Sequence, residues 1–116
     1  MVGVTDIRTG DIWLAHLDPT AGREQGGRRP VVVVSSAGFN ALPISMAIVV
    51  PLTGNDRGLV TQPRIASPDS GLNRASFARP EDVRAVDIER LGRRLGRVSA
   101  DELAEIRKLL RYFLDL

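Results

Sequence analysis

Apolar residues occur in short runs along most of the chain, separated by glycine, proline and asparagine. Residues 11–17 alternate in polarity between Gly10 and an Asp-Pro pair, which predicts a strand. Residues 31–35 form a continuous β-branched run, typical of a strand buried on both faces, and residues 47–53 predict another buried strand. Pro51 in the second run predicts a sheet edge or a bulge. Shorter strands are predicted over 61–66, 75–78 and 95–98, loops over 36–45 and 67–73, a turn over 54–58, and a strand or helical turn over 82–86.

The C-terminal segment has a helical period instead. Ser99 and Glu102 have the spacing of a capping box. Acidic residues precede basic ones, as favoured by the helix dipole. We therefore predict a helix over residues 100–113, within one domain that spans residues 1–116. Short strands followed by one helix favour a mainly β fold, a small β-barrel closed by a C-terminal helix. The apolar positions of the helix are Leu103, Ile106, Leu109, Leu110 and Phe113.

Composition narrows the possible functions. With no cysteine and one histidine, His16, the chain lacks thiolate chemistry, cysteine metal sites and a catalytic histidine pair. All but one of the 16 basic residues are arginine, and the net charge of +2 is compatible with nucleic acid but far from histone-like. The first ten residues lack a signal pattern, and the apolar run over 46–52 is too short to span a membrane. We expect a cytoplasmic protein.

A polar loop over residues 18–30 is the most informative segment. Three glycines allow tight turns and close approach of a ligand. Arg28 and Arg29 close the loop, Pro30 biases Arg29 towards an extended backbone, and Glu24 is the carboxylate among them. Guanidinium groups match phosphate oxygens, so the loop is a candidate phosphodiester site. Its alternative interpretation is a solvated hairpin loop whose arginines contribute only solubility.

An ordered series of motifs extends this picture over almost the whole chain. The series is Gly10-Asp11-Ile12-Trp13, Leu17-Asp18-Pro19, Gly22-x-Glu24-Gln25-Gly26-Gly27-x-Arg29-Pro30, Phe39-Asn40, Val49-Val50-Pro51-Leu52-Thr53, Gly71-Leu72-Asn73-Arg74-Ala75-Ser76, Arg84-Ala85-Val86-Asp87 and Arg94-Leu95-Gly96-Arg97-Val98-Ser99. It resembles the MazF/PemK/Kid family of type II toxin–antitoxin endoribonucleases, also called mRNA interferases.

The resemblance implies an SH3-like barrel of the PemK/CcdB type that works as a homodimer. Such proteins cut single-stranded RNA at a short motif without a metal or other cofactor, leaving 2′,3′-cyclic phosphate and 5′-hydroxyl ends. A MazE-like antitoxin neutralises them by lying across the dimer groove. The motif cut, and whether the target is mRNA, rRNA or tRNA, stay open.

By motif, the catalytic arginine falls on Arg29, the catalytic threonine on Thr53, and an auxiliary loop glutamate on Glu24. Arg29 suits stabilisation of phosphorane charge, because it offers parallel donors to non-bridging oxygens. A guanidinium does not act as a base, and neither does a threonine hydroxyl, so the general base is left open. We expect His16 to be a structural or surface residue and Trp13 a core or dimer-interface aromatic.

The chain has few aromatic residues, which favours recognition of a few nucleotides by hydrogen bonds over extensive base stacking. The walls of the expected groove are the loops over residues 20–28, 36–44 and 54–58. The predicted RNA contacts are Arg23, Gln25, Arg28, Asn40 and Arg57.

Two alternatives remain open. The first is a CcdB-like gyrase poison, which would depend on the end of the C-terminal helix rather than on Arg29 and Thr53. The second is a catalytically degenerate binding module on the same fold. Leu114 and Leu116 extend the apolar stripe of the helix and hint at a dimer contact.

Overall fold

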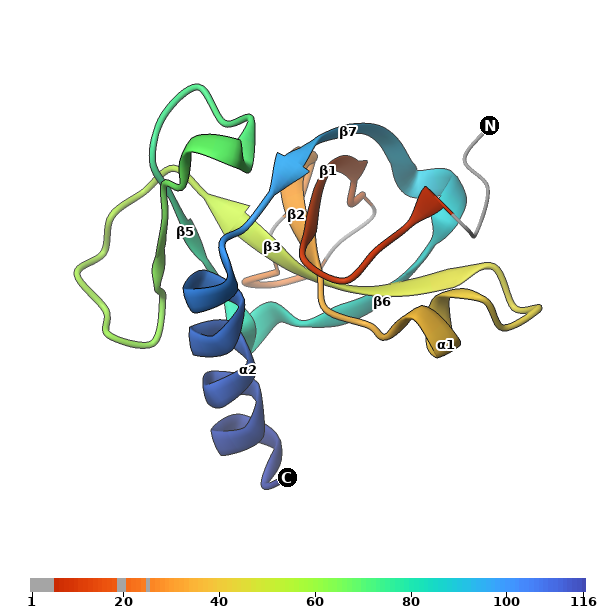
Figure 1. Ribbon diagram of the computed structural model, residues 1–116. Helices are drawn as coiled ribbons and strands as arrows, with labels where there is room; N and C mark the ends of the chain where they lie inside the picture. Colours follow the sequence, from red (N-terminus) through yellow and green to blue (C-terminus); the bar gives the residue numbers. More distant parts are fainter. Residues whose placement is uncertain (1–5, 19–20, 25) are drawn as a thin grey trace.

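A computed structural model describes residues 6–18, 21–24 and 26–116 (Figure 1). The predicted class, mainly β with a C-terminal helix, is confirmed: a curled sheet forms a half-barrel, and one long helix follows it. The elements are β1 Asp11–His16, β2 Arg28–Val33, α1 Ala37–Asn40, β3 Met46–Thr53, β4 Arg64–Ile65, β5 Ser76–Ala78, β6 Arg84–Asp87, β7 Leu91–Arg97 and α2 Ala100–Leu114. Short 3₁₀ turns occupy Pro68–Ser70, Pro80–Asp82 and Ile88–Arg90.

The sheet is antiparallel throughout its assigned pairs and has the order β4-β5-β3-β2-β1-β7. The long strand β3 pairs with β2 on one side, and its partner on the other side changes along its length. Its first half pairs with β6, and its last two residues pair with β5. This change of partner curls the sheet and brings the ends of β3 and β5 beside the loop that follows β1 (Figure 1).

The valine runs are buried on both faces of the sheet, as predicted. Val31 and Val33 belong to an apolar cluster on one face together with Trp13. Val32 and Val50 belong to a second cluster on the other face, which Ile106 of α2 joins. The alternation follows directly from the two-residue period of a strand. Because both faces are packed, β1, β2 and β3 form a rigid platform for the loops at their ends.

The position of Pro51 corrects an expectation. Pro51 lies inside β3, opposite Val31 of β2, rather than at a sheet edge or a bulge. Its carbonyl accepts a hydrogen bond from Arg79 N–H at 2.9 Å, on the side where β6 has ended and β5 begins. A proline is tolerated there because its missing N–H falls at the change of partner strands.

Two further segments differ from the sequence-based expectation, and a third contains both of its predicted structures. The predicted loop over 36–45 contains the short helix α1, which Ser36 caps by accepting a hydrogen bond from Phe39 N–H at 3.1 Å. Within the strand predicted over 61–66, only β4 forms. The chain turns just before β4, where Gln62 N–H donates to Leu59 C=O. Segment 82–86 contains both expected structures, the end of a turn and then β6.

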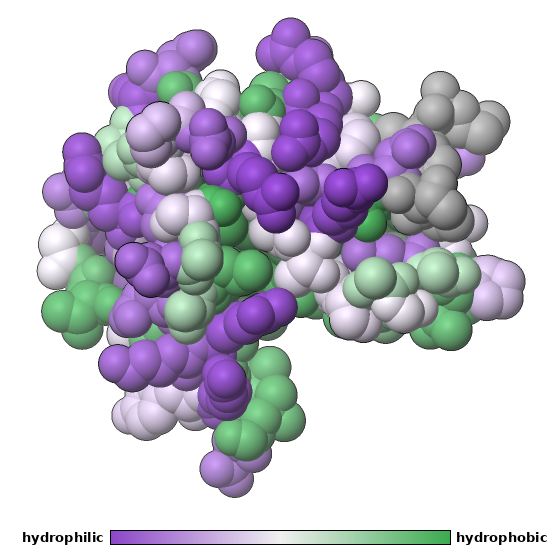
Figure 2. All heavy atoms as spheres, viewed as in Figure 1, coloured by the Kyte–Doolittle hydropathy of each residue, from purple (hydrophilic) through white to green (hydrophobic). Residues whose placement is uncertain are grey.

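Helix α2 begins as predicted at a capping box. Ser99 Oγ accepts from Glu102 N–H at 3.0 Å, and the Glu102 carboxylate accepts from Ser99 N–H at 2.8 Å. The first turns pack on the sheet, while the end of the helix projects away from it (Figure 1). Apolar side chains are visible along this projecting end (Figure 2), and Tyr112 and Leu116 are 79% and 83% exposed. Within the described ranges, no helix is long and apolar enough to cross a membrane.

Glu102 also connects α2 to the preceding loop. Its second carboxylate oxygen accepts from Ala66 N–H at 2.8 Å and Ser67 N–H at 3.2 Å. Partial burial alone would raise the pKa of Glu102, but these bonds and the bond from Ser99 N–H outweigh burial and lower it. The charged carboxylate therefore stabilises the fold at neutral pH.

We expect Glu102→Gln to lower the free energy of unfolding at pH 7 by about 2 kcal/mol, because charge-assisted bonds to three N–H groups are weakened. Since the folded pKa is lowered, the wild-type advantage is complete above the ordinary glutamate pKa of 4.5 and is lost as the pH falls below it. Urea unfolding at pH 7 and pH 3.5 measures both effects. Asp101→Asn, a charge removed from the same helix turn, is the control and should cost much less at pH 7; an equal difference at both pH values for Glu102→Gln would contradict this account.

A close backbone contact holds the loop before β5 against β7. Gly71 has φ +70°, and a Cβ atom there would overlap the carbonyl oxygen of Leu95. Gly96 faces the same loop, and a Cβ atom on it would overlap the carbonyl oxygen of Asp69. Both positions thus require glycine, one for its backbone conformation and both for space.

Candidate active site

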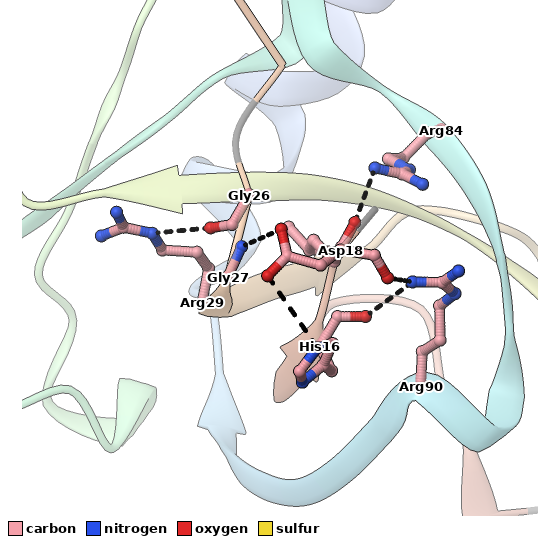
Figure 3. A network of polar contacts seen from close by, with 8 residues as sticks. His16, Asp18, Gly26, Gly27, Arg29, Arg84 and Arg90 are labelled. Carbon is pink, nitrogen blue, oxygen red and sulfur yellow. Dashed lines mark hydrogen bonds and ion pairs between the residues drawn. The ribbon is translucent and has the colours of Figure 1, made fainter. Parts of the chain in front are cut away.

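The loop after β1 is closed at its base by hydrogen bonds to the main chain. Leu17 N–H donates to Gly27 C=O at 2.9 Å, and Gly27 N–H donates to Asp18 Oδ1 at 3.0 Å. Two arginines, Arg84 at the start of β6 and Arg90 just before β7, bind the same strand end. Arg90 Nη1 donates to the carbonyl oxygens of His16, at 3.1 Å, and of Asp18, while Arg84 Nη1 donates to Leu17 C=O at 3.4 Å (Figure 3).

Glu24 lies on this loop, and its side chain bonds to the backbone of the same loop. Its carboxylate accepts a hydrogen bond from Ala21 N–H at 2.7 Å, and its N–H donates to Ala21 C=O at 3.2 Å. The side chain is exposed and does not line the pocket around Thr53 described below. Glu24 therefore shapes the loop. Gln25, predicted to contact RNA, lies outside the described residues.

Arg29 lies on β2 at the mouth of the loop and is exposed, as is its neighbour Arg28. Arg29 Nε donates to Gly26 C=O at 3.1 Å (Figure 3), which directs the guanidinium along the loop. The β2–β3 ladder ends at the pair Val31–Pro51. Arg29 and Thr53, the two residues predicted to be catalytic, therefore lie beyond the last pair of this ladder, at the same end of the two neighbouring strands.

Thr53 ends β3 and lines a pocket of about 440 Å³. Its side chain is 6% exposed, and its hydroxyl accepts from Asn55 N–H at 3.2 Å, which leaves the hydroxyl proton available for donation. The other lining residues come from three further segments, and the three arginines outnumber the single carboxylate. They are Arg23, Asn55, Arg57, Arg79 and Glu81. The structure therefore brings predicted Arg23 and Arg57 to Thr53.

Arg79 and Glu81 organise one wall of this pocket. Arg79 Nη2 donates to the carbonyl oxygen of Arg23 at 3.0 Å, which connects β5 to the loop after β1. Arg79 Nε contacts Glu81 Oε2 at 3.5 Å, and Gln62 Nε2 donates to the same oxygen at 2.7 Å. A carboxylate is thus held beside Thr53 by a guanidinium and an amide, in a site rich in positive charge.

A second, smaller pocket of about 190 Å³ adjoins the end of β3. Thr53 lines the first pocket, and its neighbours Leu52 and Gly54 line the second together with Arg29 and Arg74. The guanidinium of Arg74 lies so close to Gly54 that a Cβ atom there would overlap it. Arg29 and Thr53 therefore line adjacent pockets on either side of one strand end. An extended polyanion crossing that end would meet arginines on both sides.

The prediction that Asn40 contacts RNA is wrong. Its side chain is 1% exposed and bonds within the core, donating to Ile7 C=O at 3.3 Å and pairing with the hydroxyl of Ser35. It holds the turn around α1 to the N-terminal segment. The prediction for His16 as a surface residue is confirmed, since it is exposed and 3.9 Å from Asp18. Trp13 is a core aromatic.

Sequence reasoning did not single out four residues around Thr53: Asn55, Arg74, Arg79 and Glu81. For Arg74 and Arg79 the sequence signal was the excess of arginine between residues 57 and 97, and Asn55 lies in the 54–58 turn expected to wall the groove. Which of these arginines face β3 depends on the β3–β5 pairing, where Thr53 lies opposite Phe77. No group of three or more His, Asp or Glu side chains in the described part of the chain is placed to hold a metal ion.

Comparison with known proteins identifies the family of this chain. Residues 8–114 match the family described as PemK-like, MazF-like toxin of type II toxin–antitoxin system. The chain is 39% identical over 115 residues to endoribonuclease MazF9 of Mycobacterium tuberculosis (95% of this chain and 98% of the relative), and 38% identical over 104 residues to endoribonuclease PemK of Escherichia coli (88% and 77%).

Solved structures share the fold. MazF of Deinococcus radiodurans superposes with a TM-score of 0.80 at 29% identity, covering 94% of this chain and 96% of that one. MazF of the same organism has also been solved as a MazE–MazF complex, with a TM-score of 0.72 at 29% identity and coverage of 93% and 94%. The family model spans nearly the whole chain, and the relatives match over most of their own length. The protein therefore belongs to the PemK/MazF family of toxins of type II toxin–antitoxin systems.

Proposed function

We propose that the protein is an endoribonuclease toxin that cuts single-stranded RNA at a short motif, without a metal ion. The observation that carries the proposal is that Thr53 lines an arginine-rich pocket while Arg29 lines the adjoining pocket at the same end of β3. The names of MazF9 and PemK, both endoribonucleases, support the same activity. Recognition of only a few nucleotides fits two small pockets better than a long groove.

The proposed reaction is attack of a ribose 2′-oxygen on the adjacent phosphorus. The new P–O2′ bond forms as the P–O5′ bond breaks, which gives a 2′,3′-cyclic phosphate and a 5′-hydroxyl. Arg29 donates to a non-bridging oxygen and stabilises the added charge of the phosphorane, and Thr53 donates its hydroxyl proton in a hydrogen bond to the phosphate. The departing 5′-oxygen takes its proton from water.

We assign the acceptor of the 2′ proton to Glu81 rather than to Glu24. Glu81 lines the pocket of Thr53, where it can reach a bound ribose, whereas the Glu24 carboxylate is bonded to its own loop. Glu24 keeps an auxiliary part as the residue that shapes the loop. The remaining pocket residues Arg23, Arg57 and Asn55, together with the exposed Arg28, bind and select nucleotides.

We further propose that the toxin is a homodimer neutralised by a MazE-like antitoxin. MazF of D. radiodurans forms a complex with MazE, and this chain shares its fold. The projecting end of α2 offers apolar side chains, including Leu114 and Leu116, for such assembly.

The test is a cleavage assay on a long single-stranded RNA in the presence of EDTA. We expect discrete cuts at one short motif, with 5′ ends that a kinase labels directly and 3′ ends that carry a cyclic phosphate. The matched control is the same RNA with a 2′-deoxy nucleotide 5′ to the scissile phosphate, which should not be cut because the nucleophile is missing. If well-folded protein cuts nothing, the endoribonuclease proposal is wrong, and inhibition of DNA gyrase supercoiling is the next assay.

A further inference from the structure

Gln62 is a buried polar residue beside the Thr53 pocket. Its side chain is 4% exposed, and its Nε2 donates to Glu81 Oε2 at 2.7 Å. The reverse orientation of the amide would face its oxygen against a carboxylate oxygen, so the contact determines the orientation. The residue stands just before β4, where its own N–H is bonded to Leu59 C=O at 3.0 Å. A buried residue at the end of an exposed turn thus presents an amide donor to a pocket carboxylate.

The other end of the same amide has no hydrogen-bond partner among the described residues, because Gln62 Oε1 is buried and unsatisfied. Burial of an unpaired acceptor is unfavourable, and an apolar side chain of similar size would avoid it. A stability argument therefore does not explain a glutamine here. What the glutamine provides is the hydrogen bond to Glu81.

The hydrogen bond from Gln62 restrains the Glu81 side chain, which would otherwise be free to change rotamer. The Glu81 side chain is 40% exposed, and its contact with Arg79 Nε is long at 3.5 Å. The shorter bond from buried Gln62 selects one rotamer of Glu81, the one that keeps the carboxylate against Arg79. Arg79 in turn binds the carbonyl oxygen of Arg23, so the same polar chain reaches the loop after β1.

We propose that Gln62 is a positioning residue for the RNA-cleaving site: it holds the Glu81 carboxylate at the geometry needed to accept the 2′ proton beside Thr53. This inference rests on the proposed endoribonuclease function. Gln62 touches neither substrate nor reacting atoms, and acts only through Glu81. Supporting residues of this kind commonly change rates 10–100-fold, because a displacement of about 1 Å in a reacting group is enough.

The direct test is Gln62→Met, which keeps the volume and removes the N–H donor. In the EDTA assay with a short RNA that contains the mapped motif, we expect kcat to fall about 10- to 100-fold while KM stays within about threefold. The urea midpoint should be unchanged or higher, since the unpaired acceptor is also removed. Ser70→Ala, another buried polar residue outside both pockets, is the matched control and should keep the wild-type kcat.

A double-mutant cycle separates positioning from a general structural effect. In a Glu81→Ala background the amide has nothing to position, so adding Gln62→Met should change kcat by less than twofold. A full 10-fold effect in that background, or a wild-type kcat for Gln62→Met alone, would overturn the inference. In the second case the endoribonuclease assignment would stand, because the wild type would still cut RNA.

An NMR measurement is independent of activity. The chain has only two glutamines, Gln25 and Gln62, so the glutamine side-chain amide signals are simple to assign. We expect slow exchange of one Gln62 amide proton in the wild type and its loss in Glu81→Ala. A rapidly exchanging amide in the wild type would overturn the positioning role even if RNA is cut. If the wild type cuts no RNA, the positioning role is overturned together with the proposed function, whatever the amide shows.

Discussion

Arg29→Ala is expected to lower the rate of RNA cleavage about a thousandfold and to leave the fold intact. The rate falls because the variant loses the paired donors that stabilise the phosphorane, a loss of the size seen when an oxyanion donor is removed. The fold survives because the side chain is exposed and makes a hydrogen bond only to the loop carbonyl of Gly26 among its described contacts. The measurement is single-turnover cleavage of the mapped motif, with the urea midpoint as the folding check.

Arg28→Ala is the matched control, because Arg28 is the neighbouring exposed arginine on the same strand. Its loss should weaken RNA binding several-fold at low salt, with little change in the rate of the bound complex, as expected for a phosphate contact. Arg29→Lys should recover only a part of the lost rate, since an ammonium cannot form the two parallel bonds of a guanidinium. Near wild-type cleavage by Arg29→Ala would show that the assigned mechanism is wrong.

The second large effect concerns folding. Gly71→Ala should destabilise the protein by about 4 kcal/mol, of which about 1–2 kcal/mol comes from a positive φ and the rest from overlap with the carbonyl of Leu95. This is a large part of the ~5–15 kcal/mol typical of a whole domain. Urea and thermal unfolding measure it, and a fall in Tm of about 15 °C is expected.

Gly58→Ala provides the comparison that separates the two terms. Gly58 has φ +66°, close to that of Gly71, but nothing lies within 4 Å of a Cβ atom at that position. Its substitution should therefore cost only the backbone term, about 1–2 kcal/mol. Equal losses for the two variants would mean that the loop before β5 moves away from β7 without cost, and that the close contact does not stabilise the fold.

The hydrophobic pattern of the sequence predicted best the strands that are buried on both faces and the helix that buries one regular apolar stripe. The valine runs of β2 and β3 are covered on both faces, and α2 has a capping box and a regular apolar stripe. Strand β7 was predicted only in its last part, because it is rich in exposed arginine and its pairing with β1 contains two irregularities. Such a strand has no two-residue period to detect.

The candidate site was predictable to the extent that it lies on local motifs. Arg29 and Thr53 were predicted because each belongs to a short local motif that resembles the family pattern, and each motif lies at the end of a strand. Arg79 and Glu81 were not, because their approach to Thr53 depends on which strand pairs with the end of β3. The prediction that Asn40 contacts RNA was wrong because this polar residue, expected in a loop, is hydrogen-bonded inside the core.

The anchoring of the loop after β1 has an evolutionary consequence. Arg84 and Arg90 bind carbonyl oxygens of residues 16–18, and Arg79 binds the carbonyl of Arg23. Every residue type provides a carbonyl oxygen, so these attachments are indifferent to the side chains of the loop. The side chains of the loop, and with them the proposed RNA contacts, can therefore change while the attachment of the loop is kept. The proposed RNA contacts and the fold are thus free to evolve at different rates.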